Sequence, residues 1–428
     1  MATHKTGQQP DGHPIRFRAI YRLRGQRVQG HLYPDAELCY KPRIEHTAFS
    51  PKRFPGTNTA TGSRTFFPAP AHEQQDAVFA PAFELIQQAI ADRVFPAASV
   101  AITHQGNLVG LKAFGRFTYE LDSPAATTAT IFDLASVAKV VATTSMAMML
   151  YERGLLDLDL PVVAVVAEFA GEDPRRDAVT LRMLLAHSSG LPAYEKLFMR
   201  VKTRDELLSA AFATPLTANP GAKTEYSDIG FIILGAALER IAEESLDRFC
   251  QHEVFGPLPM THTAFNPPSA WQASIAPTAN DQSFRHRIIQ GEVQDENASV
   301  MGGVAGHAGV FASAEDLATF AHAMLSGGRP ILRPETLVVF TRRESSPPTT
   351  SRALGWDTPS SPSQSGKYFS SNSFGHLGYT GTSLWIDPDR QLSITLLTNR
   401  TWPDCSNQAI KQLRPKFHDT VIESLKGS

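Results

Sequence analysis

Apolar residues with helical spacing begin at Gln74. From there, apolar side chains recur every three or four positions, as on one buried face of a helix. These are Val78, Phe79, Phe83, Leu85, Ile86 and Ile90. Two runs with strand character follow, Ala98–Thr103 and Asn107–Ala113, around a turn that contains Gly106. The pattern therefore predicts one helix and a β-hairpin.

The longest apolar segment covers residues 137–153 and ends at Gly154. Its apolar residues do not gather on one stripe but lie on nearly every side of a helix. A helix of this kind is buried all round. The segment therefore predicts a helix in the centre of the protein, stopped by a glycine at its C-terminal end.

Residues 155 to about 330 alternate between short helical patterns and loops. The expected helices are Leu181–His187, Arg204–Phe212, Ile229–Ala242, Leu246–Val254 and Ala314–Leu325. Beyond them, residues 345–373 are rich in Ser and Pro and predict a long surface loop. Strands return at Ser383–Ile386 and Leu392–Thr398, and a helix over Gln408–Leu425 closes the chain.

Together these patterns predict an α+β fold. We expect an antiparallel sheet with the terminal helices against it, built from residues of about 76–150 and 330–425. A helical part over about 151–330 completes a domain spanning 76–425, with the active site in the cleft between the two parts. Residues 1–75 show little periodicity, and we expect a poorly structured N-terminal extension there.

Composition excludes several functions. The chain has 428 residues, with 40 Lys plus Arg against 42 Asp plus Glu, so its net charge of −2 gives no general attraction to nucleic acid or membranes. An arginine-rich stretch over residues 16–27 is either a nucleic-acid-binding tail or a solvated extension, and we favour the latter. Three distant cysteines predict neither a disulfide framework nor a zinc site.

No apolar run reaches the length of a membrane span, and the N-terminus lacks the apolar core of a signal peptide. The chain as given therefore predicts a cytoplasmic protein without a membrane span. A periplasmic or secreted location stays open if residues 1–75 are not the native start. The oligomeric state is not predicted.

Candidate chemistry begins at Ser136 and Lys139, at the start of the long apolar segment. Residues three apart on a helix share a face, so the ammonium reaches the hydroxyl. A serine is a poor nucleophile unless a neighbouring base takes its proton. A lysine serves as that base if its pKa is lowered, and we expect burial to lower the pKa of Lys139.

Two further motifs lie downstream. Tyr226-Ser227-Asp228 falls in a loop before an apolar helix, 90 positions after Ser136, and His376-Leu377-Gly378 follows another 150 positions later. The three motifs resemble the S-x-x-K, Y-x-N and H-x-G motifs of the serine β-lactamase and penicillin-binding protein superfamily. The tyrosine is similar to that of the branch with class C β-lactamases, D-alanyl-D-alanine carboxypeptidases and family VIII carboxylesterases. Two other segments resemble this branch, Leu184–Pro192 and Gly303–Phe311.

The resemblance covers roughly residues 78–425 and implies a β-lactamase-like fold. It implies that Ser136 is the nucleophile, that Lys139 relays its proton and that Tyr226 is the general base and acid. A phenolate at Tyr226 would need the charge of Lys139 beside it. The oxyanion hole would consist of the backbone N–H groups of Ser136 and Tyr379, and Gly378 would line the substrate site.

Two positions depart from the β-lactamase motifs. Asp228 stands at the Asn of Y-x-N, and His376 stands at the Lys of K-T-G. Both changes make the expected substrate site less positive, so it should bind a substrate carboxylate less well. We therefore favour a carboxylesterase acting on short-chain acyl esters. A D-alanyl-D-alanine carboxypeptidase or class C-like β-lactamase is the alternative, and an acyl-binding sensor without turnover is a minor one.

Two other residues, His307 and Ser188, are candidates for a role in the site. His307 lies between glycines and either lines the cleft or only bonds the backbone of its loop. Ser188 lies in Ala186-His187-Ser188-Ser189-Gly190, close to a nucleophile elbow, but Ala replaces the first glycine and no strand precedes it. The sequence has no phosphate-binding loop, dinucleotide fingerprint or paired zinc histidines. We therefore expect a small ester or amide substrate and neither metal nor cofactor.

Overall fold

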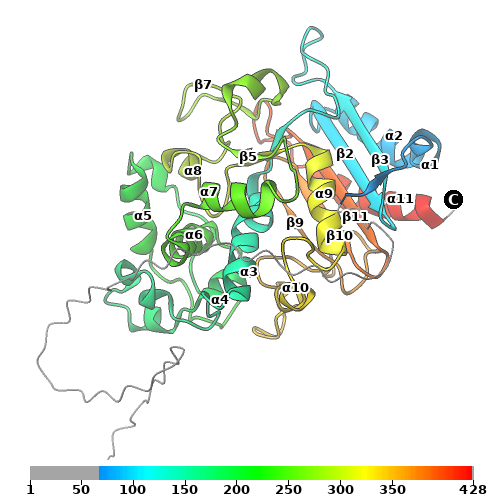
Figure 1. Cartoon of the computed structure of the whole chain (residues 1–428). Helices are drawn as coiled ribbons and strands as arrows, with labels where there is room; N and C mark the ends of the chain where they lie inside the picture. The colour runs from blue at the N-terminus through cyan, green and yellow to red at the C-terminus, as the bar shows by residue number, and fades with distance from the viewer. Residues whose placement is uncertain (1–66, 427–428) are drawn as a thin grey trace, which may run out of the picture. The chain divides into compact units, whose positions relative to one another are not determined.

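The computed structural model describes residues 67–426 (Figure 1). Its largest sheet has six strands in the order β1-β3-β2-β11-β10-β9. The strands are β1 Ala69–Pro70, β2 Ala97–His104, β3 Asn107–Gly115, β9 Phe374–Leu377, β10 Ser383–Asp387 and β11 Leu392–Thr398. All neighbouring strands are antiparallel except β1 and β3. The central pair joins β2 to β11, so both ends of the domain share one sheet, as predicted.

Strand β2 shows how the sheet separates two cores. Its Ala98, Val100 and Ile102 are buried with α2 (Ala80–Ala91) and α11 (Ile410–Lys426). Ala97 and Ala101 point the other way and belong to the other core, together with the helical part of the chain. Because successive side chains of a strand point to opposite faces, one sheet buries both of its surfaces. The helices expected at the two ends of the domain do cover the sheet.

The second face of the sheet is covered by α9 (Ala314–Leu325), which contacts β2, β10 and β11. Most remaining helices make up the part drawn at the left of Figure 1. They are α3 Ser145–Glu152, α4 Leu181–Leu185, α5 Arg204–Phe212, α6 Asp228–Ala242, α7 Leu246–Cys250 and α8 Glu296–Val300. A further helix, α10 Pro334–Thr341, contacts α3. The α+β architecture predicted from the sequence is confirmed.

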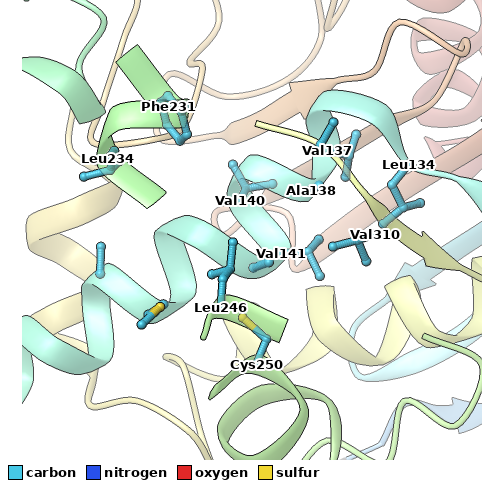
Figure 2. Packing of buried hydrophobic residues seen from close by; sticks show 14 of the residues in the cluster. Leu134, Val137, Ala138, Val140, Val141, Phe231, Leu234, Leu246, Cys250 and Val310 are labelled. Carbon is cyan, nitrogen blue, oxygen red and sulfur yellow. The ribbon is translucent and has the colours of Figure 1, made fainter. Parts of the chain in front are cut away.

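The long apolar segment forms a helix in three pieces. A 3₁₀ turn covers Ala135–Val137, a π-helical stretch covers Lys139–Thr144, and α3 follows. The predicted single regular helix is therefore wrong in its first half, although its burial is confirmed. Figure 2 shows Val140 and Val141 of this segment lying between α6 and α7, and all side chains of the π-helical stretch are buried. This packing fixes the position of Ser136.

The segment before β9 differs from its prediction. Within residues 345–373, Trp356 and Phe369 are buried, and short bridges tie Arg352 to Asp357 and Asp357 to Gly375. The expected loop is confirmed, since no helix or strand falls within these residues, but it lies only partly at the surface, because two large aromatic side chains anchor it in the cores. The expected extension over 1–75 and its arginines lie almost entirely outside the described residues. The short strand β1 falls inside that range.

Residues 67–426 contain no helix that combines the length and the apolarity needed to cross a membrane.

Candidate active site

A cavity of about 670 Å³ lies where the sheet meets the helical part. Its lining brings together residues from all three sequence motifs: Ser136, Tyr226, Asp228, His307, His376, Gly378 and Tyr379. Lys139 lies behind this lining and is fully buried. Residues separated by up to 243 positions thus share one site. The volume is within the usual range for small-molecule sites, about 300–1,000 Å³.

The Lys139 ammonium makes three hydrogen bonds. Its Nζ donates to Ser136 Oγ at 2.9 Å, to Asp228 Oδ1 at 2.6 Å and to the carbonyl of His307 at 3.1 Å. Burial lowers the pKa of Lys139, but the charges and hydrogen bonds of Asp228 and Tyr226 together outweigh burial, so the pKa is raised above its ordinary value. The expectation of a low pKa was wrong, because it counted burial without the carboxylate partner. Lys139 is a cation at neutral pH.

Asp228 is the first residue of α6 and is 19% exposed at its side chain. The helix is capped by Ser227, whose Oγ accepts from the Gly230 N–H at 3.0 Å. A carboxylate is favoured at a helix N-terminus by the helix dipole. Asp228 lines the cavity, as expected, but its charge is directed to Lys139 and forms an ion pair with it. A neutral Asn in its place could not form this pair.

Tyr226 is held in place by His187, which sequence reasoning did not include. The carbonyl of His187 accepts from the Glu225 N–H at 2.8 Å, and its Nδ1 accepts from the Ser227 N–H at 3.0 Å. The two rings lie 4.6 Å apart between centroids. His187 therefore fixes the backbone on both sides of the tyrosine. In the sequence, His187 lies within Leu184–Pro192, one of the two further segments that resemble the family.

The Tyr226 hydroxyl is buried and has no hydrogen-bond partner of good geometry among the described residues. Burial raises the pKa of Tyr226, the nearby Lys139 charge lowers it in part, and Asp228 raises it again, so the net pKa is raised. The phenolate expected beside Lys139 is therefore not favoured, because burial opposes a charge on Tyr226. Asp228 neutralises the cation that was meant to stabilise the phenolate.

His376 lies on β9 and is neutral, as expected. Its Nδ1 lies 2.8 Å from the Leu377 carbonyl and donates to it, which leaves Nε2 as an acceptor. Burial, followed by the charges of Lys139 and Arg352, holds the pKa of His376 well below its usual value. Nε2 is buried and has no partner in the part of the chain that the structure describes. It is available to a ligand in the cavity.

Two threonines join the third motif to the nucleophile segment. Thr380 Oγ1 donates to the Asp133 carbonyl and Thr382 Oγ1 to the Leu134 carbonyl, each at 2.8 Å. Within residues 67–426, the N–H groups of Ser136 and Tyr379 donate no hydrogen bond. These are the two N–H groups that the sequence predicts for the oxyanion hole. They are available for an oxyanion at the site.

Arg414 of α11 supports the same segment from behind. Its Nη2 donates to the carbonyls of Gly378 at 2.6 Å and Thr382 at 3.0 Å. Gly378 has no room for a Cβ atom, because Thr382 Oγ1 and the Leu134 carbonyl lie against its Cα. The third motif is therefore fixed between the nucleophile segment and the C-terminal helix.

His307 is buried at the edge of the cavity. Its Nε2 lies 2.8 Å from Asp295 Oδ1, and its own carbonyl accepts from Lys139. The preceding Gly306 packs against α6, where a Cβ added to Gly235 would lie 2.9 Å from the Gly306 Cα. Of the two readings of His307, the structure supports the first: it lines the cavity, and its ring bonds Asp295 at the start of α8 and not the backbone of its own loop. Asp295 was missed because no motif surrounds it.

Arg352 also lines the cavity and was not predicted. Its guanidinium carbon lies 5.3 Å from the centroid of the Tyr226 ring. The residue comes from the Ser- and Pro-rich segment, where the sequence offered no motif. The alternative nucleophile Ser188 is buried and is not among the residues that line the cavity. Across residues 67–426, no group of three or more His, Cys, Asp or Glu side chains is arranged to hold a metal ion.

Comparison with known proteins assigns the family. The family model described as Beta-lactamase matches residues 82–414. An N-acetylmuramyl-L-alanine amidase of Bacillus subtilis (strain 168) is 33% identical over 72% of this chain and 77% of its own length. A protein of Escherichia coli (strain K12), provisionally named a D-alanyl-D-alanine carboxypeptidase, is 32% identical over 72% of this chain and 79% of its own.

Solved structures agree on the fold. The hydrolase EstCE1, described as having promiscuous acyltransferase activity, has a TM-score of 0.66 at 22% identity and covers 81% of this chain and 99% of its own. The octameric penicillin-binding protein homologue of Pyrococcus abyssi has a TM-score of 0.63 at 22% identity, and the match covers 81% of this chain and 77% of the homologue. The chain belongs to the beta-lactamase family of serine hydrolases.

Proposed function

We propose that this hydrolase cleaves the amide bond of a small peptide substrate through an acyl-enzyme on Ser136. The observation that carries the proposal is the hydrogen-bonded chain from Ser136 Oγ through Lys139 Nζ to Asp228 Oδ1, at 2.9 and 2.6 Å. This chain links a serine at a small-molecule cavity to a carboxylate that can accept a proton. Tyr226 and two unpaired backbone N–H groups lie at the same cavity.

The first step removes the proton of Ser136. Lys139 is already protonated, so it accepts this proton only as it passes one of its own to Asp228. Ser136 Oγ then bonds to the substrate carbonyl carbon, and the carbonyl oxygen becomes an oxyanion. The N–H groups of Ser136 and Tyr379 would donate to it; one such donor typically contributes a factor of about 10²–10³ in rate.

Tyr226 completes acylation as the general acid. Its raised pKa keeps it protonated, which suits a group that must give a proton to a leaving nitrogen. The proton taken from Ser136 then returns to Tyr226 through Lys139. The bond from the carbonyl carbon to the leaving group breaks, and the acyl group stays on Ser136. In deacylation, water replaces the leaving group and the same proton path regenerates the free serine.

Two observations favour an amide over an ester. An amine is a poor leaving group without a proton donor, and a neutral buried tyrosine is such a donor. The relatives that are about one-third identical over most of both chains are named as an amidase and a carboxypeptidase. A carboxylesterase acting on short-chain acyl esters is the second candidate. It is favoured by the neutral His376, which lacks the positive charge of a lysine at that position.

The test compares kcat/KM on one preparation for four substrates: a D-Ala-D-Ala peptide, an N-acetylmuramyl-L-alanine peptide, p-nitrophenyl butyrate and nitrocefin. We expect turnover of at least one of the two peptides, and loss of all activity in Ser136→Ala. Turnover confined to p-nitrophenyl butyrate would support the carboxylesterase instead. Turnover confined to nitrocefin would support a β-lactamase. Residual turnover in Ser136→Ala would contradict the nucleophile.

A further inference from the structure

We propose that Arg352 binds a carboxylate of the substrate, in the cavity beside Tyr226 and His376. The inference rests on the proposed hydrolase function and adds the group that the substrate must carry. It also names the residue that recognises this group.

The backbone around Arg352 is tied to the strand that carries His376. Arg352 pairs with Asp357 in an antiparallel bridge, and Asp357 pairs in turn with Gly375 of β9. The Asp357 N–H donates to the Gly375 carbonyl at 2.8 Å, and the Gly375 N–H donates back at 2.9 Å. Arg352 is therefore fixed relative to the third motif. A recognition residue needs such a fixed position, because an unfixed side chain loses entropy on binding.

The guanidinium of Arg352 has unused hydrogen-bond donors. Within residues 67–426 it makes no hydrogen bond, and its one ion pair is long, with Nε 3.8 Å from Asp357 Oδ1. That carboxylate oxygen already accepts from Ser351 Oγ at 2.9 Å and from the Thr358 N–H at 3.0 Å. Arginine presents several donors in a plane that matches a carboxylate. At Arg352 these donors are without acceptors in the described chain.

The other two arginines that line the cavity differ in this respect. Arg400 donates to the carbonyl of Tyr379 at 2.6 Å, and Arg414 donates to the carbonyls of Gly378 and Thr382. Both are 5% exposed or less, and both support the backbone of the third motif. Their donors are therefore engaged in holding the site. Arg352, with 18% of its side chain exposed, is the arginine at this cavity that remains available to a ligand.

The carboxylates near Arg352 are engaged with other partners, which leaves its charge available to an anion. Asp228 is neutralised by Lys139 at 2.6 Å, so it repels a substrate anion less than its sequence position implied. His376 Nε2 and the Tyr226 hydroxyl are buried and unpaired nearby, and Tyr226 lies under the guanidinium. The positive charge that His376 lacks is thus supplied by another segment. The expectation that this pocket holds anions poorly considered the motifs alone and did not include Arg352.

The test uses two matched substrate pairs. The first is a D-Ala-D-Ala peptide with a free C-terminal carboxylate and its C-terminal amide. The second is mono-p-nitrophenyl succinate and p-nitrophenyl butyrate, which differ in a carboxylate on the acyl group. For each pair, the ratio of kcat/KM between the charged and the neutral substrate is measured in the wild type, Arg352→Gln and Arg352→Lys. Arg342→Gln is the control, because Arg342 is exposed and does not line the cavity.

We expect the ratio to exceed one in the wild type for at least one pair and to fall at least tenfold in Arg352→Gln. Arg352→Lys should retain part of the ratio, since it keeps the charge without the planar donors. Arg342→Gln should match the wild type. Asp357→Asn provides a second variant, and its ratio should rise because it removes the competing carboxylate. Equal ratios in the wild type and Arg352→Gln would overturn the proposal.

Failure of the proposed function gives a different result. Labelling of Ser136 by an alkyl fluorophosphonate reports whether the nucleophile is intact in each variant. If the wild type is labelled at Ser136 but shows no preference for either charged substrate, the hydrolase function stands and the role of Arg352 is wrong. If the wild type is not labelled, the acyl-enzyme proposal itself is wrong. If Arg352→Gln does not fold, the ratio in Asp357→Asn tests the role of Arg352. A ratio above that of the wild type supports the proposal, and an unchanged ratio contradicts it.

Discussion

Replacing Asp228 by Asn removes the negative charge beside Lys139 and keeps the size of the side chain. Nζ and Oδ1 are 2.6 Å apart, and Lys139 is fully buried. At an effective dielectric constant of about 20, two unit charges at this distance attract by about 6 kcal/mol before solvent screening. Without this attraction, burial, the largest influence on Lys139, lowers its pKa; the lowering reaches about 3–5 units in fully buried lysines.

The change in Lys139 sets the expected pH dependence. In the wild type, Lys139 is protonated and passes a proton to Asp228, so the relay operates at neutral and mildly acidic pH. In Asp228→Asn, no acceptor lies behind Lys139, and Ser136 reacts only after Lys139 has lost its proton. We expect kcat/KM at pH 6 to fall by about 10²–10³. Activity should recover as the pH rises through the lowered pKa of Lys139.

The assay is the pH profile of kcat/KM for p-nitrophenyl butyrate from pH 5 to 10. Asp159→Asn is the matched control, because it removes an exposed carboxylate that pairs with Arg182. The acidic limb of the Asp228→Asn profile should lie at higher pH than that of the wild type, and the control should overlay the wild type. An unchanged profile, or a faster Asp228→Asn enzyme at pH 6, would refute the relay.

The ion pair also contributes to stability. Since the folded pKa of Lys139 is raised, this contribution is present below the pKa of an unfolded lysine and is lost as the pH rises through the folded pKa. Removing one partner of a buried pair typically costs about 3–5 kcal/mol. Denaturant unfolding at pH 7 should therefore show a less stable Asp228→Asn protein. The deficit should shrink as the pH rises through the lowered pKa of Lys139 in Asp228→Asn, because the variant then buries a neutral amine that needs no partner. A constant deficit would argue against the ion pair as its cause.

Three further variants test separate parts of the site. Lys139→Ala and Tyr226→Phe should each lower kcat/KM by about 10²–10⁴ in steady-state kinetics. Because both residues act in one proton path, the double variant should be little worse than the worse single variant. Additive losses would show that the two residues have separate roles. Arg414→Met should lower kcat more than it raises KM, since it frees the Gly378 carbonyl behind the oxyanion hole; equal effects would contradict this. Phe231→Ala should cost about 3–5 kcal/mol in denaturant unfolding, because the ring is fully buried under Lys139; a cost below 1 kcal/mol would contradict the packing.

The sequence predicted the elements with clear periodicity. The bounds of α5, α9 and β11 agree with the expected ranges, because Ser or Thr caps begin the two helices and β11 is a run rich in apolar residues without Gly or Pro. Strand β9 was not predicted as a strand, since Phe374–Leu377 contains a glycine and a histidine and shows no alternation. Pairing with the neighbouring strand β10 forms it, and the motif residues Gly375 and His376 mask the strand signal in the sequence.

The site was predicted where motifs exist and missed elsewhere. Ser136, Tyr226 and His376 came from motif spacing and lie together at the cavity. His187 and Arg352 lie against the ring of Tyr226, and a single sequence does not show such contacts. The prediction of a low pKa for Lys139 was wrong for the same reason, because its partner Asp228 lies 89 positions away in the sequence. Local sequence gives burial, whereas the charge state depends on tertiary neighbours.

Covalent trapping of the nucleophile tests the central claim most directly. The protein is incubated with an alkyl fluorophosphonate, and intact-protein mass spectrometry is followed by peptide mapping. The account predicts a single adduct on the peptide that contains Ser136, no adduct in Ser136→Ala, and slower labelling in Lys139→Ala. An adduct on the peptide that contains Ser188, or labelling of Ser136→Ala at the wild-type rate, would contradict it.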